Sequence, residues 1–216
     1  MNPLREFIAL TLKESKRKTF SIDELRTLND LDDVLNYAGS RLKFLGEGEA
    51  RAVYELSSTR VLKVAKQKEK MGGPWQNEIE VKVFIDYLVK PIIARIYDYD
   101  LAMKWIVAEK VKPLNDRKIM RSLGYKGNYN DACEKFLQLW DFYGLFGLLV
   151  DPDSEAREDL WDEFNDVASN DQFKTIVDGI QILKDRYHLQ VGDLIRPEHW
   201  GLTSAGRIVI YDYGCT

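Results

Sequence analysis

The fold is decided by residues 41–65, which read RLKFLGEGEARAVYELSSTRVLKVA. Three short apolar segments lie in this stretch, at residues 42–45, 52–56 and 61–65. A loop with two glycines separates the first two segments, and a Ser-Ser-Thr-Arg turn separates the last two. Apolar runs of this length between such turn residues are typical of strands, so the stretch predicts an antiparallel meander.

Helical and strand-like patterns continue on both sides of this meander. Before it, residues 1–40 read as a helical extension in which Ser21 and Glu24 have the spacing of a capping box. We expect this extension to pack on the strands. After the meander, residues 76–89 predict a helix, and two further strands are expected at residues 92–99 and 105–111.

The second half of the chain has a different pattern of apolar residues. Three aromatic-rich segments show helical spacing, at residues 130–147, 154–168 and 172–187. We expect their large apolar side chains to form core: Phe136, Leu139, Trp140, Phe164 and Ile180. A loop at residues 191–201 and a short strand at residues 207–211 follow. Strands followed by helices predict an α+β fold.

The predicted organisation is one folding domain with two lobes and an extension. Residues 1–40 form the extension, residues 41–111 a five-stranded antiparallel N-lobe with one key helix, and residues 112–216 a reduced, mostly helical C-lobe. The seam between the lobes is expected near Lys112 and Pro113. Ligands favour such seams.

The composition is that of an ordinary globular protein. Of 216 residues, 45% are apolar and 31% charged, which suffices to bury a core without disulfides or metals. A net charge of −4 argues against a nucleic-acid-coating protein, and two cysteines and two histidines argue against structural zinc. No apolar run is long enough to cross a bilayer, and the N-terminus lacks the order of a secretory signal. We therefore expect a soluble, cytoplasmic protein without a membrane partner.

The glycine-containing loop is the first candidate binding element. Gly46 and Gly48 would let a turn between two strands bring backbone N–H groups close to a phosphate, because no side chain intervenes. Glycine-rich hairpin turns are common, so this loop by itself indicates a turn as readily as a phosphate site.

Lys63 and Glu80 are charged residues in positions where apolar ones are expected. Lys63 lies in the middle of an apolar strand, where it either points to solvent or meets a phosphate or a carboxylate. Glu80 falls on the apolar stripe of the predicted helix, which contains Val83, Phe84, Tyr87 and Leu88. A carboxylate on a buried face needs a cation, and Lys63 is the expected partner. Glu78 is the alternative partner, but Lys82 four residues later gives Glu78 a surface explanation.

Two segments near the C-terminus complete the set of candidate features. Residues 192–202 form a polar loop with Asp193, Arg196 and His199, and residues 207–214 form an apolar strand that ends in Asp-Tyr-Gly. Either segment taken singly could be a surface turn.

The order of these four features resembles the protein-kinase fold and the related small-molecule kinases, such as the aminoglycoside phosphotransferases. In that family a Gly-rich loop covers ATP, a strand lysine pairs with a helix glutamate, an Asp-Leu-Lys-Pro-Glu-Asn loop supplies the base, and Asp-Phe-Gly supplies a metal ligand. The likeness runs from about Arg41 to the C-terminus and is nearest to small kinase-like proteins of bacteriophages and bacteria. A phage-encoded protein of this kind would work in the host cytoplasm.

The resemblance implies a binding site for ATP and Mg²⁺. Gly46, Gly48 and Arg51 would lie over the phosphates, and the pair of Lys63 and Glu80 would orient them. The strand at residues 105–111 would be the hinge between the lobes. The backbone around Glu109 and Val111 would bind the adenine edge, with Ala52 and Val53 covering the ring.

The resemblance also implies catalytic and metal-binding roles near the C-terminus. Asp193 would accept the proton of the phosphate acceptor, and Arg196 would neutralise charge on the transferring group. Asp212 would hold Mg²⁺, with His199 at the second metal position.

Three departures from the family pattern bear on activity. Arg51 stands at the third glycine position, where it would either touch phosphate or block its close approach. His199 stands where the family has a metal-binding asparagine, and the loop from Asp193 is one residue longer than usual. The sequence ends at Thr216, two residues after Gly214, so we expect no activation segment or peptide-docking helices.

Two functions follow from this pattern. The first is an ATP-dependent phosphotransferase whose acceptor is a small molecule, a partner protein or the protein itself. The second is a pseudokinase that binds a protein partner, with or without nucleotide. A third reading is an unrelated α+β scaffold with accidental motifs.

Overall fold

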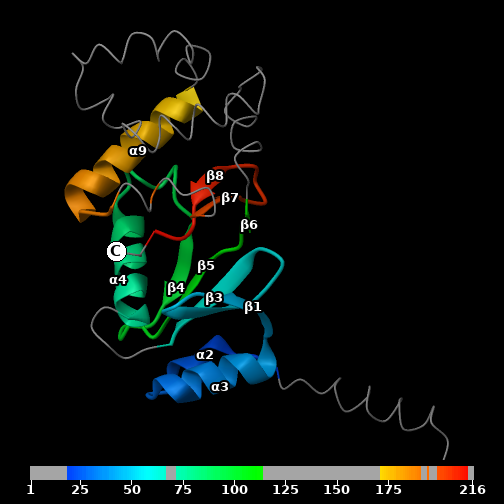
Figure 1. Cartoon of the computed structure of the whole chain (residues 1–216). Helices are drawn as coiled ribbons and strands as arrows, with labels where there is room; N and C mark the ends of the chain where they lie inside the picture. Colours follow the sequence, from blue (N-terminus) through cyan, green and yellow to red (C-terminus); the bar gives the residue numbers. More distant parts are fainter. Residues whose placement is uncertain (1–18, 67–71, 114–170, 191–193, 195–198, 214–216) are drawn as a thin grey trace, which may run out of the picture. The chain divides into compact units, whose positions relative to one another are not determined.

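The computed structural model describes residues 19–66, 72–113, 171–190, 194 and 199–213 (Figure 1). Contacts between Cα atoms divide the chain into two compact units. The first unit contains Met1–Asn77 and Asp98–Val107, and the second contains Glu78–Tyr97 and Ala108–Thr216. The predicted helices at residues 130–147 and 154–168, with the core residues Phe136, Leu139, Trp140 and Phe164, lie outside the described residues.

A five-stranded antiparallel sheet has the strand order β1-β2-β3-β5-β4. Its strands are β1 (Lys43–Glu47), β2 (Arg51–Glu55), β3 (Arg60–Ala65), β4 (Ile96–Tyr99) and β5 (Trp105–Glu109). The hairpins β1–β2 and β2–β3 confirm the predicted meander. Together with its helices, the sheet makes a mixed α and β structure that is consistent with a kinase-like fold.

The described part of the N-terminal extension contains helices α2 (Ile22–Arg26) and α3 (Leu31–Arg41) in the first unit. The side chain of Ser21 accepts a hydrogen bond from the backbone N–H of Glu24 at 3.3 Å, as the predicted cap requires. The carboxylate of Asp30 caps the second helix by accepting a hydrogen bond from the backbone N–H of Asp32 at 2.8 Å.

These helices bury apolar side chains against the strands. Helix α3 packs on β2 and β3 (Figure 1), which confirms the expectation for the described part of the extension. The core of the first unit consists of Leu25, Leu31, Val34, Tyr37, Ala38, Ala52, Tyr54, Leu62, Val64, Ala65, Trp105 and Val107.

Helix α4 (Gly73–Ile85) begins and ends earlier than predicted. Pro74 in the first turn is compatible with a helix start, because proline lacks the N–H that this turn leaves unpaired. After the helix, Asp86 accepts a hydrogen bond from the backbone N–H of Leu88 at 3.0 Å and favours a turn. The predicted apolar stripe is therefore wrong beyond the helix end, where Tyr87 and Leu88 are exposed.

The second unit contains helix α9 (Asp171–Tyr187) and a three-stranded antiparallel sheet. The strands are β6 (Lys112–Pro113), β7 (Trp200–Leu202) and β8 (Ile208–Ile210), in that order across the sheet. Strands β6 and β7 were not expected, whereas β8 confirms the strand predicted at residues 207–211.

One apolar core joins the elements of the second unit. It consists of Val83, Val89, Ile92, Ile93, Ile176, Ile180, Leu183, Leu189, Leu194, Trp200, Ile208, Ile210 and Tyr213. Ile180 is fully buried, as predicted.

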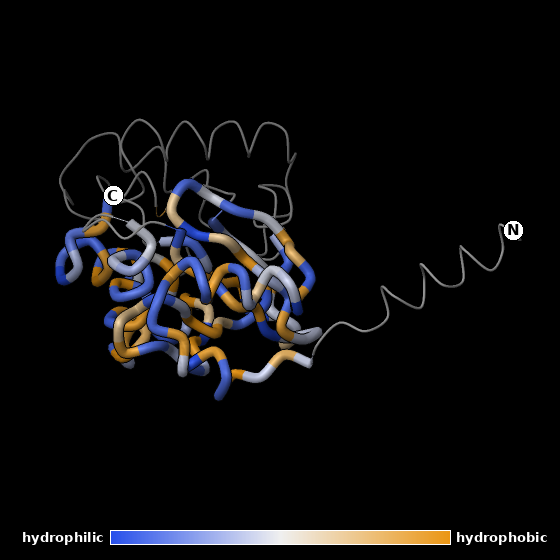
Figure 2. The backbone as a smooth tube through the Cα atoms, turned by 90° about the horizontal axis from the view of Figure 1, so that it is seen from below, coloured by the Kyte–Doolittle hydropathy of each residue, from blue (hydrophilic) through white to orange (hydrophobic). Residues whose placement is uncertain are grey.

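Apolar residues are distributed over many short segments. Figure 2 shows hydrophobic and hydrophilic residues alternating over short distances along the described chain. Accordingly, none of the described helices combines the length and the apolar character needed to span a membrane.

Candidate functional site

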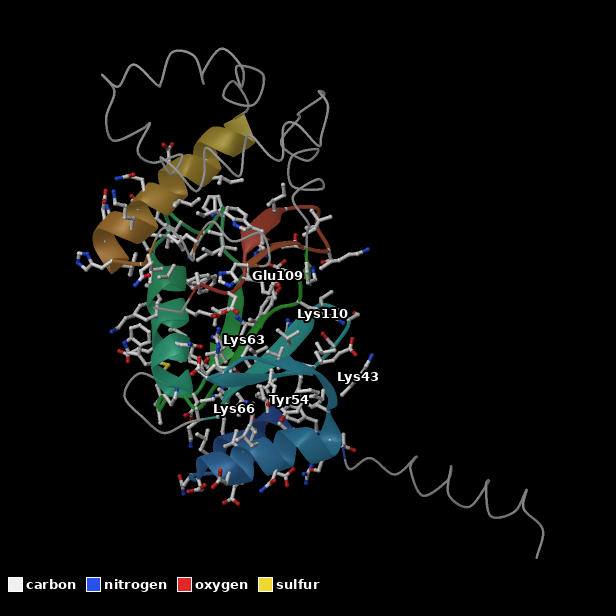
Figure 3. All side chains as sticks on the ribbon, viewed as in Figure 1. Lys43, Tyr54, Lys63, Lys66, Glu109 and Lys110 are labelled. Carbon is white, nitrogen blue, oxygen red and sulfur yellow. The ribbon has the colours of Figure 1, made fainter. Side chains whose placement is uncertain are left out.

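Lys63 lies in the middle of β3 (Figure 3). It pairs in register with Val53 of β2, and Val53 also pairs with Gly46 of β1. Only 6% of Lys63 is exposed, so the alternative in which this side chain simply points to solvent is wrong. A buried ammonium requires compensating polar or charged groups.

Glu80 lies on the buried face of α4, with 1% of its surface exposed. The neighbouring Glu78 has the surface explanation that its spacing predicts, because its carboxylate pairs with Lys82 at 2.6 Å on the outside of the helix. The identification of Glu80, rather than Glu78, as the inward-facing carboxylate is therefore confirmed.

The glycine-containing loop connects β1 and β2 and is held by Lys66. A bulge interrupts the β1–β2 register between Phe44 and Gly46. The ammonium of Lys66 donates to the carbonyl of Gly48 at 3.2 Å and lies 2.9 Å from the carboxylate of Glu47. A Cβ added at Gly46 or Gly48 would meet nothing within 4 Å. The protein itself therefore places no steric demand for glycine at either position.

Arg51 begins β2 and is turned into the first unit. It is 5% exposed, and its guanidinium donates to the side-chain oxygen of Asn77 at 3.4 Å. Asn77 is fully buried and donates to the carbonyl of Met103 at 2.8 Å. Met103 has a φ of 56°, an uncommon conformation for a residue other than glycine, and this hydrogen bond stabilises it. Arg51 is thus part of a polar link between β2, α4 and the turn before β5.

The predicted hinge residues lie at the end of β5 and just after it. The N–H of Glu109 donates to the carbonyl of Arg95 at 2.8 Å. The Glu109 carboxylate is buried and accepts a hydrogen bond from Arg207 at 2.8 Å (Glu109 is labelled in Figure 3). Val111 is half-buried beside Gly201, where an added Cβ would lie 2.7 Å from a Val111 methyl carbon. Adenine binding by Glu109 and Val111 stays a prediction.

The β7–β8 hairpin brings His199 and Asp212 to the same end of the three-stranded sheet. Trp200 pairs with Ile210, and the N–H of Tyr211 donates to the carbonyl of His199 at 2.9 Å. Asp212 is the next residue after Tyr211 and is half-buried. The two predicted metal-site residues are therefore neighbours along the hairpin.

The predicted catalytic residues Asp193 and Arg196 lie outside the described residues. Leu194, which lies between them in the sequence, is described. The indole of Trp200 donates to the carbonyl of Leu194 at 2.9 Å, and both side chains are buried. The catalytic roles of Asp193 and Arg196 stay predictions.

Tyr213 connects the Asp-Tyr-Gly segment to helix α4. Its side chain is 1% exposed, and its hydroxyl donates to the backbone carbonyl of Glu80 at 3.3 Å. Glu80 and Tyr213 are 133 residues apart in the sequence. The structure therefore brings together two segments that sequence reasoning singled out independently, one in the helix and one at the C-terminus.

The donor set near the hairpin fits Mg²⁺ in part. Among the described residues, no three His, Cys, Asp or Glu side chains gather closely enough to hold a metal ion by themselves. Mg²⁺ is commonly bound by one or two carboxylates together with substrate phosphates and water, so Asp212 fits such a site. The imidazole of His199 is a poor magnesium ligand.

Sequence reasoning missed two polar residues that organise this region. Asn77 precedes Glu80 by three residues on α4, and this helical spacing was the available signal. Arg207 is 98 residues from Glu109, and nothing in the local sequence of either residue indicates the pairing.

Comparison with solved structures gives several similarities, among them two with low TM-scores. No protein-family model matches the sequence, and no curated protein shows significant similarity to it. SAICAR synthase from Saccharomyces cerevisiae, solved with SAICAR, is similar at a TM-score of 0.34 and 11% identity, over 80% of this chain and 73% of the synthase. APH(2″)-IIia, solved with GDP and kanamycin, is similar at a TM-score of 0.34 and 17% identity, and the match covers 80% of this chain and 66% of the APH(2″)-IIia chain. Because these scores are too low to carry an argument, the kinase-like interpretation rests on the strand order, motifs and contacts of the chain itself.

Proposed function

We propose that this chain is a kinase-like protein that binds ATP together with Mg²⁺ and transfers the γ-phosphate to a small molecule or a protein. The observation that carries the proposal is the hydrogen bond from the Tyr213 hydroxyl to the Glu80 carbonyl. This bond links two segments. One is helix α4, which carries Glu80, the predicted partner of Lys63; the other is the Asp-Tyr-Gly segment, which carries the predicted metal ligand Asp212. An accidental resemblance of separate motifs gives no reason for these two segments to meet.

The residues have separate roles in this proposal. Lys63 would neutralise phosphate charge, with Glu80 as its sequence-predicted partner. Asp212 would hold Mg²⁺, which supplies charge stabilisation at the phosphates when bound. Arg196 would stabilise charge on the transferring group, and Asp193 would accept the proton of the acceptor hydroxyl. Catalysis of this kind depends mainly on positioning and on electrostatic stabilisation.

Thermal unfolding with nucleotide tests the binding site directly. A ligand that binds only the folded state at 100 times its Kd stabilises that state by about 2.7 kcal/mol. For a chain of this size, Mg-ATP should therefore raise Tm by about 5–10 °C. The variants Lys63→Ala and Asp212→Ala should abolish this shift.

Matched variants control for unspecific effects of charge removal. Lys82→Ala removes a lysine from the exposed face of α4, and Asp33→Ala removes an exposed aspartate from α3. Both should keep the Mg-ATP shift of the wild type. Absence of any shift at millimolar Mg-ATP in the wild type would contradict the proposed function.

A pseudokinase that acts by binding another protein is the second candidate. It is favoured by Arg51, whose guanidinium bonds Asn77 within the protein at the position where the kinase pattern has a third glycine. It is also favoured by His199 at a metal position. In this case the chain would bind nucleotide or none, and no γ-phosphate would leave ATP.

A further inference from the structure

The ion pair between Glu109 and Arg207 is a partly buried polar contact that the proposed roles leave unused. A guanidinium nitrogen of Arg207 lies 2.8 Å from the Glu109 carboxylate, and the side chains are 29% and 8% exposed. Glu109 is the last residue of β5, in the predicted hinge, and Arg207 immediately precedes β8. The pair thus connects the hinge to the hairpin that leads into Asp212.

Each partner is also fixed by further hydrogen bonds. The other terminal nitrogen of Arg207 lies 3.4 Å from the carbonyls of Lys90 and Pro91, in the connection between α4 and β4. The Glu109 carboxylate also accepts a hydrogen bond from the backbone N–H of Arg95 at 3.3 Å. Arg207 therefore contacts both the end of β5 and the connection before β4, and its geometry is determined by several directional bonds.

The hairpin also contacts the residue that follows the hinge and the connection before β4. Lys112 pairs with Leu202 between β6 and β7. On the other side, the N–H of Ala94 donates to the carbonyl of Ile210 at 2.9 Å, and Ile93 forms a parallel bridge with Ile210. The segments next to both partners of the ion pair are therefore held to β7 and β8, and β8 ends two residues before Asp212.

We propose that Arg207 is a positioning residue for nucleotide binding, which aligns the adenine-binding backbone at Glu109 with the hairpin that presents Asp212. This inference rests on the proposed function. Ion pairs add little net stability whether they are exposed or buried, but their directional bonds specify one geometry. The pair is therefore better explained by the geometry that it sets than by the stability that it gives.

Nucleotide affinity and unfolding temperature, measured separately, test this role. Arg207→Met should weaken Mg-ATP binding about tenfold or more and lower Tm, because the Glu109 carboxylate stays buried without its cation. The double variant Glu109→Gln/Arg207→Met leaves no unpaired charge, so it should recover most of the Tm but keep the weak binding. Arg207→Lys should restore part of the affinity, since it keeps the charge but not the forked geometry.

Arg186→Met is the matched control. Arg186 pairs with the half-buried carboxylate of Asp86 at 3.1 Å in the same unit, and neither residue belongs to the predicted hinge. This variant should lower Tm without changing the Kd for Mg-ATP.

The inference is overturned if Arg207→Met binds Mg-ATP like the wild type, or if the double variant recovers affinity together with Tm. A wild type that does not bind Mg-ATP would instead overturn the proposed function, and this inference with it. If Arg207→Met does not fold, the double variant decides alone.

Discussion

Glycines in this chain differ in whether the neighbouring atoms leave space for a side chain. Gly46 and Gly48 face open space, so their small size is not required by protein neighbours. Gly73 at the start of α4 is different, because a Cβ there would lie 2.5 Å from the carbonyl oxygen of Ala50 and from the Cα of Ala65. Backbone atoms cannot move aside as the end of a side chain can. Gly73 therefore lets α4 approach the strands, whereas the space beside Gly46 and Gly48 would be available to a ligand in the proposed site.

Alanine substitutions should separate these two uses of glycine. Gly73→Ala should lower the free energy of unfolding by about 1–3 kcal/mol, as forced overpacking does. Gly48→Ala should change it by less than about 0.5 kcal/mol, the usual range for a surface position, but should weaken Mg-ATP binding. Urea unfolding and nucleotide titration of both variants provide the comparison. Equal stability losses in the two variants would show that the close approach at Gly73 can relax.

At the level of elements, local sequence predicted the strands better than the ends of the helices. Short apolar runs and turn residues located β1, β2, β3 and β8, because each of these strands follows directly from nearby residues. The end of α4 depends on Asp86, whose side chain bonds the N–H of Leu88 and competes with the helix. The strands β6 and β7 have two and three residues, which is too short for a periodic signal.

The candidate site was predictable to the extent that its residues break a local pattern. Lys63 in an apolar strand and Glu80 on an apolar helix face are such breaks, and both are buried. Tyr213 was part of a recognised motif, but its contact with Glu80 depends on tertiary packing. The pair of Glu109 and Arg207 lies beyond local prediction for the same reason.

Asp86 joins the ends of α4 and α9, and its titration should appear in the stability of the fold. The N–H of Leu88 holds the pKa of the Asp86 carboxyl below its ordinary value of 3.8; partial burial opposes this, and Tyr187 and Arg186 lower the pKa further. A carboxyl with a lowered pKa stabilises the folded state above the unfolded pKa, and this contribution is lost as pH falls through the folded value. Asp86→Asn should therefore cost on the order of 1 kcal/mol at pH 7, discounted for partial exposure.

The pH dependence of this loss distinguishes charge from shape. Below about pH 4 the difference between Asp86→Asn and the wild type should shrink, and it should vanish once the wild-type carboxyl is protonated. Asp178→Asn, at an exposed position of α9, serves as the control and should differ little from the wild type at either pH. A difference at Asp86 that persists unchanged in acid would mean that the carboxylate charge is not the cause.

At the scale of the whole molecule, the proposed function and its alternative differ in whether ATP would be turned over. The departures from the kinase pattern do not bear equally on this question. The guanidinium of Arg51 is hydrogen-bonded to Asn77, so this residue bears on the conformation of the loop between β1 and β2. In the proposed site, His199 would instead stand where the kinase pattern has an oxygen ligand, so it would bear directly on charge stabilisation during transfer. The distinction between a kinase and a pseudokinase would therefore depend most on the side chain of His199.

His199→Asn should decide between these two functions. An amide oxygen suits Mg²⁺ better than an imidazole does, so release of labelled γ-phosphate from ATP, with a cell lysate as the source of acceptors, should rise about tenfold, equivalent to about 1.4 kcal/mol in the barrier. The matched control is His188→Asn, because His188 is exposed and has a φ of 55°, which asparagine tolerates. It should leave turnover unchanged. Lower turnover in His199→Asn would give the imidazole a part of its own in transfer, whereas intact Mg-ATP binding without turnover in every variant would identify the chain as a nucleotide-binding pseudokinase.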